Sequence, residues 1–113
     1  MEEISTLLKK YDKFKYAQLR SIQQLSASHK IVTIAIQDDD GEDTNIVHLE
    51  FKNITESKIL VNSVLSFLDM GDGIILIKEN DLYGFALGCG SAMLQVHNAP
   101  LYIVAKEMYI EEK

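Results

Sequence analysis

The sequence lacks most features that mark secreted and membrane-bound proteins. Its single cysteine, Cys89, has no second cysteine with which to form an internal disulfide. No apolar run has the length of a membrane helix, and the first residues, Met1-Glu2-Glu3, are acidic where a signal peptide would be basic. Internal repeats and low-complexity segments are missing as well. We therefore expect a cytoplasmic protein with no membrane partner.

Length and charge further restrict the domain organisation and the partners that we expect. The 113 residues fit a single domain, residues 1–113, which is long enough to bury a core without disulfides or metals. The formal net charge of −6 opposes binding to nucleic acid. Positive charge is concentrated near the start of the chain, where lysines are typical of a solvated helix face: Lys9, Lys10, Lys13, Lys15 and Arg20.

Alternating apolar residues predict a β-rich fold. Two alternating segments, 30–37 and 45–52, flank an acidic turn that contains glycine, which indicates an antiparallel hairpin. The side chains expected in its core are Val32, Ile34, Val47, Leu49 and Phe51. His48 and Glu50 would then point to the other face.

Further strands are expected on both sides of this hairpin. Residues 15–25 fit a helix or a strand, and we favour a strand because the neighbouring segments need a partner. Residues 74–77 are apolar on both faces, which predicts a central, covered strand. Gly84 within the next strand, 82–87, indicates a bulge or the close approach of another backbone. An irregular connection, with a possible strand at 92–97, leads to a last strand over 101–110.

Two segments have the periodicity of amphipathic helices. Ile4, Leu7, Leu8 and Tyr11 predict a short helix over 3–12, and a broad apolar stripe predicts the main helix over 58–70. The element order predicts an α+β fold. We expect a mostly antiparallel sheet or partly closed barrel, with the main helix packed on it and a short N-terminal helix.

The acidic turn is the first candidate binding surface. It contains Asp38, Asp39, Asp40, Glu42 and Asp43. A calcium-binding EF-hand with Gly41 at its sixth position would place Ile36 and Val47 at ligand positions, so we expect no metal there. Clustered carboxylates can instead attract a basic partner protein by electrostatic steering. The simpler interpretation is a solvated hairpin tip.

The segment Gly88-Cys89-Gly90-Ser91 is an alternative site. Met93 replaces the third glycine of a dinucleotide-binding fingerprint, so the glycines do not predict a phosphate site. Cys89 would act as a nucleophile if His97 or His48 lay beside it as a base. The competing interpretation is a buried cysteine that serves as a small apolar side chain. The three histidines lack the paired spacing of metal ligands.

Part of the chain resembles a diffuse group of small bacterial β-rich proteins. The resemblance lies in residues 16–22, 32–38, the Asp40-Gly41 turn and 49–54, in this order, and so covers about residues 16–54. Some members of that group resemble immunity proteins encoded beside polymorphic toxins. This chain has Asn53 where a glycine is common. The resemblance implies a strand over 16–24, and it implies no catalytic residue in this chain.

Together these features predict a non-catalytic protein-binding domain without a cofactor. Its narrowest form is an immunity-like inhibitor of a basic partner protein, which would contact residues 38–43. Two alternatives stay open. One is a small-ligand-binding protein or enzyme that uses a pocket near residues 84–91. The other is a homodimer that pairs through an edge strand.

Overall fold

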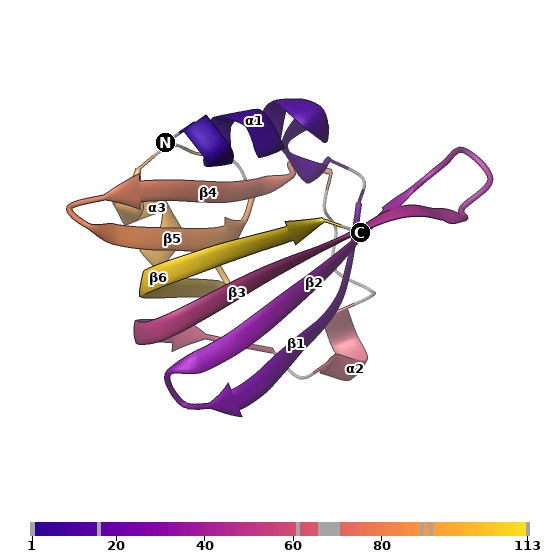
Figure 1. The fold of residues 1–113 in the computed structure, drawn as a ribbon. Helices are drawn as coiled ribbons and strands as arrows, with labels where there is room; N and C mark the ends of the chain where they lie inside the picture. The colour runs from indigo at the N-terminus through magenta and orange to yellow at the C-terminus, as the bar shows by residue number, and fades with distance from the viewer. Residues whose placement is uncertain are drawn as a thin grey trace.

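A computed structural model describes residues 2–15, 17–60, 62–65, 71–88, 90 and 92–112. Its strands are β1 (Gln18–Ser26), β2 (His29–Gln37), β3 (Asp43–Lys58), β4 (Ile74–Glu79), β5 (Leu82–Leu87) and β6 (Tyr102–Glu112). Its helices are α1 (Glu2–Lys10), α2 (Asn62–Leu65) and α3 (Met93–His97), with a 3-10 turn η1 (Asp12–Phe14) after α1. Figure 1 shows their arrangement.

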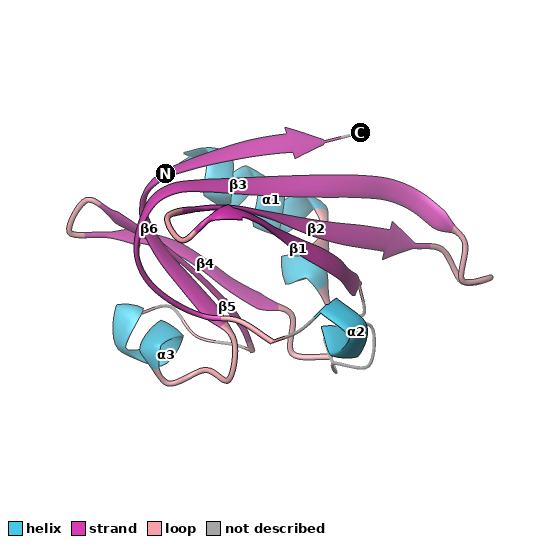
Figure 2. Ribbon diagram, turned by 90° about the horizontal axis from the view of Figure 1, so that it is seen from below, coloured by secondary structure: helices cyan, strands magenta, loops and turns pink. Residues whose placement is uncertain are grey.

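The six strands form one open sheet in the order β1-β2-β3-β6-β5-β4, and every neighbouring pair is antiparallel. The two longest strands, β3 and β6, curve strongly through the middle of the sheet (Figure 2). The register between them shifts at residues 54–56, next to Asn53, whose φ is +55°. Because such irregularities bend a strand, the β1–β2 side of the sheet turns toward the β4–β5 side.

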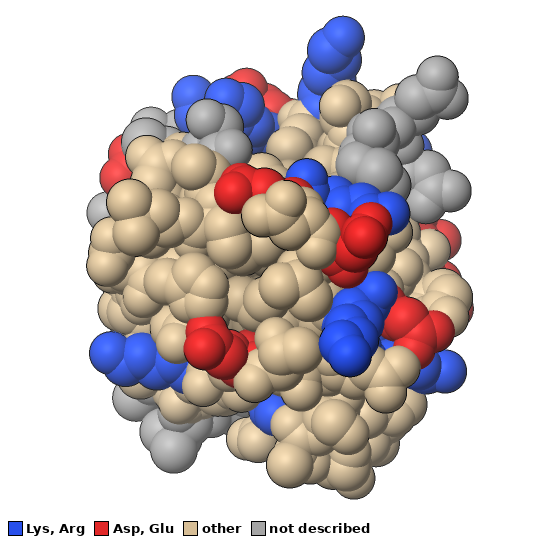
Figure 3. All heavy atoms as spheres, turned by 90° about the vertical axis from the view of Figure 1, so that its left-hand side faces the viewer, with Lys and Arg blue, Asp and Glu red and all other residues tan. Residues whose placement is uncertain are grey.

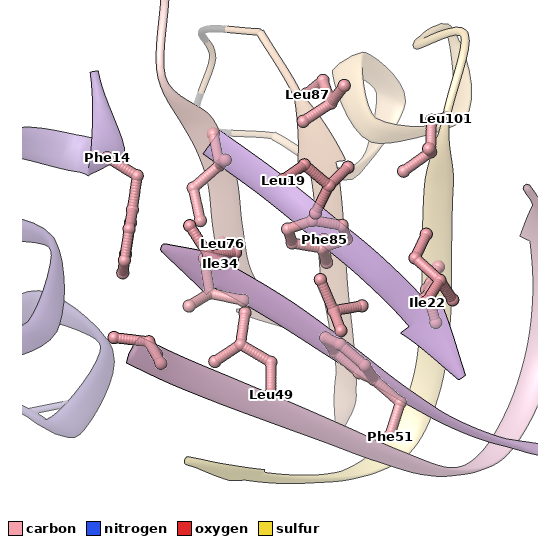
Figure 4. Close-up of a cluster of buried hydrophobic side chains, with 14 of the residues drawn as sticks. Phe14, Leu19, Ile22, Ile34, Leu49, Phe51, Leu76, Phe85, Leu87 and Leu101 are labelled. Atoms are coloured by element: carbon pink, nitrogen blue, oxygen red, sulfur yellow. The ribbon is translucent and has the colours of Figure 1, made fainter. Parts of the chain in front are cut away.

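The main core lies inside this bend. Phe51 of β3 and Phe85 of β5 face each other with ring centroids 5.8 Å apart. Figure 4 shows side chains from both halves of the sheet meeting in one cluster. Its largest fully buried members are Phe14, Leu19, Ile34, Leu49, Phe51, Leu65, Leu76, Phe85, Leu101 and Ile103. The bend therefore gives an open sheet an interior of its own.

The predicted hairpin is confirmed in its register. Val32 pairs with Leu49 and Ile34 pairs with Val47, and these four side chains are fully buried. Phe51 is buried as well, opposite Lys30. The strand favoured over 15–25 is present as β1, and the short N-terminal helix is present as α1.

Helix α1 lies beside β4 (Figure 1) and buries Ile4 and Leu7 in the main core. The chain then turns through η1, where the Lys13 carbonyl oxygen approaches Gly73 so closely that a Cβ on that glycine would overlap it. Gly73 has φ of +78°, which glycine adopts without the strain of other residues. This contact joins η1 to the segment that leads into β4.

The main helix predicted over 58–70 is wrong in its extent. Lys58 is the last residue of β3, where it pairs with Tyr102, and the helix found in the described chain covers only Asn62–Leu65. Residues 61 and 66–70 lie outside the described residues. Pairing with β6 places Lys58, the first residue of the predicted helix, in β3. Part of that apolar stripe still reaches the core, since Leu65 is fully buried and Leu60 packs against the cluster.

Three smaller predictions also need correction. Strand β4 is an edge strand rather than a central one; it is apolar on both faces because Ile74 and Leu76 join the main core, while Ile75 joins a second cluster with Val96. Residues 92–97 contain helix α3, not a strand. The close approach at Gly84 comes from side chains of α3, because a Cβ there would lie 2.9 Å from the Met93 sulfur.

Candidate functional site

The acidic turn projects from the body of the protein as the tip of the β2–β3 hairpin (Figure 1). One Asp38 carboxylate oxygen accepts hydrogen bonds from the backbone N–H groups of Asp40, at 2.9 Å, and Glu42, at 3.0 Å. Gly41, with φ of +80°, donates its N–H to the Asp38 carbonyl oxygen at 3.0 Å. Asp38 therefore holds the turn in one conformation, a role that aspartate side chains often have in turns.

Asp43 is held at the base of the tip. Its two carboxylate oxygens accept hydrogen bonds from the Arg20 guanidinium at 2.9 and 2.6 Å, and the Gln37 side-chain amide donates another at 3.2 Å. The hydrogen bonds from Arg20 lower the pKa of the Asp43 carboxyl below its usual range. Asp43 thus joins the hairpin to β1.

The sequence placed five acidic residues in this turn without distinguishing them, and the structure divides them into two groups. Asp38 and Asp43 shape and anchor the turn. All five residues are exposed, and Asp39, Asp40 and Glu42 lie between the other two at the tip. On the side of the molecule opposite the hairpin, acidic and basic side chains are interspersed (Figure 3). The projecting tip therefore concentrates negative charge that this opposite face does not.

The alternative site around Cys89 is only partly described. Cys89 and Ser91 lie outside the described residues. His97 lies in α3, where its Nδ1 is 2.9 Å from the Glu56 carboxylate and its ring lies edge-on to Tyr102. The second candidate base, His48, lies on the outer face of β3 instead. The space next to Gly84 is filled by the Met93 and Val96 side chains.

A feature that the sequence did not predict is a groove on the outer face of the sheet. The described helices pack against β1, β4, β5 and β6, whereas the outer face of β2 and β3 holds a hollow of about 360 Å³ that is open to solvent. Two cross-strand rows line it. The first row is Gln23, Ile31, Glu50 and Tyr109, and the second includes Thr33, His48 and Glu111.

Hydrogen bonds fix several side chains around this outer-face groove. His29 Nε2 lies 2.6 Å from a Glu50 carboxylate oxygen, and His48 Nδ1 lies 3.0 Å from the Thr33 hydroxyl. The Tyr109 hydroxyl donates to Glu107 at 2.9 Å, and this hydrogen bond raises the pKa of the Tyr109 phenol above its usual value. The groove is therefore lined by side chains that are already oriented.

The alternation in 45–52 predicted that His48 and Glu50 point away from the core, and both line the outer-face groove. The sequence did not reveal which strand pairs with β3 on its other side, so the groove itself was not predicted. Tyr109 and Glu111 come from β6, about sixty residues further along the chain, and β6 pairs with β3 only in the folded sheet. Within the described part of the chain, no group of three or more histidine, cysteine or acidic side chains is arranged to hold a metal ion.

The two edges of the sheet are β1 and β4. Helix α2 lies against β1, while α1 and η1 lie against β4. Both edge strands therefore have a helix as a neighbour in addition to their one strand partner. No described helix is long and apolar enough to span a membrane.

Comparisons with protein-family models, with curated proteins and with solved structures gave no match. A functional assignment therefore depends on the geometry and charge of this chain itself.

Proposed function

We propose that this protein is a non-catalytic protein-binding domain whose β2–β3 hairpin tip contacts a basic surface of a partner protein. The observation that carries the proposal is the projection of the tip from the body of the protein, with Asp39, Asp40 and Glu42 exposed (Figure 1). A projecting, negatively charged loop can enter a concave basic surface that a flat face cannot reach.

The internal hydrogen bonds of the tip support a binding role. Asp38 and Gly41 hold the turn before a partner binds. Binding would therefore cost less conformational entropy than it would for a flexible loop that becomes ordered in the complex. The exposed carboxylates would also raise the association rate with a basic partner by electrostatic steering.

The narrowest form of the proposal is an immunity-like inhibitor that covers the basic active site of a toxin. It is supported by the acidic tip and by the resemblance of residues 16–54 described above. A cytoplasmic location belongs to the same proposal, and the single cysteine of the chain agrees with a reducing compartment. A gene for a basic toxin beside the gene for this protein would be the most direct support.

The experiment begins with capture of the partner from the native host and measurement of association rates at low and high salt. The test variant is Asp39→Asn/Asp40→Asn, which removes two charges and leaves Asp38 and Asp43 in place. At low salt we expect it to associate at least about threefold more slowly than the wild type, and the wild-type rate should fall steeply as salt is added.

A matched control removes two charges from the β4–β5 turn, at the other end of the molecule in Figure 1. It is Glu79→Gln/Asp81→Asn; both residues are exposed, and the new amide oxygen can still accept the Met93 N–H that Glu79 accepts at 3.1 Å. The control should associate at the wild-type rate. Equal low-salt rates for the tip variant and the wild type would eliminate the tip as the contact surface.

A further inference from the structure

We propose that the outer-face groove binds an arginine side chain of the same basic partner. This inference rests on the proposed function, because it assumes that the partner presents basic residues. It adds a second contact surface on β2, β3 and β6, separate from the hairpin tip.

The charge of the lining is the first argument. Glu50 and Glu111 are the two acidic residues among the described residues that line the groove, and neither lysine nor arginine is among them. His29 and Lys52 are opposite each other in the adjacent cross-strand row, where His29 contacts Glu50 and Lys52 lies over the Tyr109 ring. The acidic lining residues of the groove can therefore attract a cation.

The other lining residues favour guanidinium over a simple ion. Tyr109 offers an aromatic ring, and Lys52 Nζ already lies 5.3 Å from its centroid, so the structure contains one cation at this ring. Ile31 offers an apolar contact for an aliphatic stem. A guanidinium donates several hydrogen bonds in a plane, which suits two carboxylates and a stacking ring better than an ammonium does.

The size of the groove fits an amino-acid side chain rather than a bare ion. Its volume of about 360 Å³ lies at the lower end of the range for small-molecule sites, about 300–1,000 Å³. Because the groove is open to solvent, an approaching protein surface could insert a side chain without a rearrangement of the sheet.

The groove and the tip lie along the same two strands. Thr33 of β2 lines the groove, and Asp38 begins the turn just after the end of β2, five residues further along the chain, which corresponds to about 17 Å of extended chain. A specific interface buries about 800 Å² on each partner, which is wide enough to span both. One basic partner lying along β2 and β3 would therefore contact the tip and the groove together.

The first test uses a small probe and amide chemical shifts measured by NMR. The probe is N-acetyl-arginine amide, and its neutral control is N-acetyl-citrulline amide, which has nearly the same shape. At neutral pH and low salt, the arginine probe should shift residues 31–33, 48–50 and 109–111, with a Kd of about a millimolar. Citrulline should leave these residues unshifted. Equal shifts with both probes, or arginine shifts spread evenly over exposed acidic residues, would overturn the proposal.

The second test uses Glu50→Gln/Glu111→Gln, in which the amide at position 50 can still accept a hydrogen bond from His29. Loss of two charge-assisted contacts should lower the affinity for the probe, and for the captured partner, by about tenfold or more. The control Glu79→Gln/Asp81→Asn should bind both as the wild type does. An unchanged thermal midpoint and unchanged core chemical shifts would show that the groove variant is still folded.

The two proposals fail in different ways. If Asp39→Asn/Asp40→Asn slows the association of the partner while Glu50→Gln/Glu111→Gln leaves its affinity unchanged, the groove proposal is wrong and the proposed function stands. If both variants bind the partner as the wild type does, both proposals are wrong. Support for the groove requires a weaker partner complex as well as the arginine-dependent shifts.

Discussion

Replacing Phe51 by alanine tests whether the two halves of the bent sheet share one core. The Phe51 side chain has 0% exposure in β3, and its ring lies 5.8 Å from that of Phe85 in β5. The substitution removes an aromatic ring from a closely packed interior and leaves a cavity that the neighbours fill only in part. Such substitutions cost about 3–5 kcal/mol.

That loss is large for a chain of this size. Domains of this kind unfold with a free energy of about 5–15 kcal/mol. At roughly 4 °C per kcal/mol, the midpoint of thermal unfolding should fall by about 12–20 °C. Urea unfolding followed by circular dichroism would give the same loss as a lower midpoint with an unchanged slope.

The control is Leu94→Ala, because Leu94 is 73% exposed and its truncation should change stability by less than about 0.5 kcal/mol. A double-mutant cycle with Phe85→Ala isolates the contact across the bend, which should contribute about 0.5–1.5 kcal/mol of coupling. A loss below about 1 kcal/mol in Phe51→Ala, or strictly additive losses in the cycle, would refute the shared core.

Three further predictions concern a buried leucine, a strained glycine and an ion pair. Leu65→Asp should abolish cooperative unfolding or cause aggregation, because it places an unpaired charge at a fully buried position; a soluble variant with a sharp melting transition would contradict this. Gly73→Ala should cost about 1–3 kcal/mol more than Gly41→Ala, since both glycines have positive φ but only Gly73 faces a backbone oxygen; equal losses in urea unfolding would refute the η1 contact. The lowered pKa of Asp43 means that its pairing with Arg20 stabilises the fold above the unfolded pKa of about 4, and that this stability is lost as pH falls through the lower folded value. In Arg20→Gln, NMR titration should show the Asp43 pKa rising toward its usual value; an unchanged pKa would contradict the pairing.

Local patterns predicted the elements whose partners are near in sequence. The β2–β3 hairpin follows from two alternating segments across a short turn, and its register follows because a shift of one residue would move Val32 and Ile34 out of the core. Helix α1 follows from its apolar stripe, because such a helix buries only one face. The same local reasoning found the acidic tip, which is the binding surface that we propose.

The errors arose where distant segments decide the outcome. The apolar spacing of 58–70 fits a helix, but β6 pairs with Lys58 and keeps this first residue in β3. The apolar run of β4 is typical of a central strand, and here an edge strand is covered instead by α1 on one side and by the cluster under α3 on the other.

The sequence by itself determined a β-rich chain with a paired hairpin and an acidic turn, because alternation, turn residues and charge act over a few neighbouring positions. Only the tertiary structure decided which acidic residue of the turn is anchored, since Arg20 reaches Asp43 from another strand. It also decided the outer-face groove, because Glu50 and Tyr109 become neighbours only when β6 pairs with β3. Cross-strand pairing joins residues that no local pattern connects, and in this protein it creates the groove that we propose binds an arginine side chain.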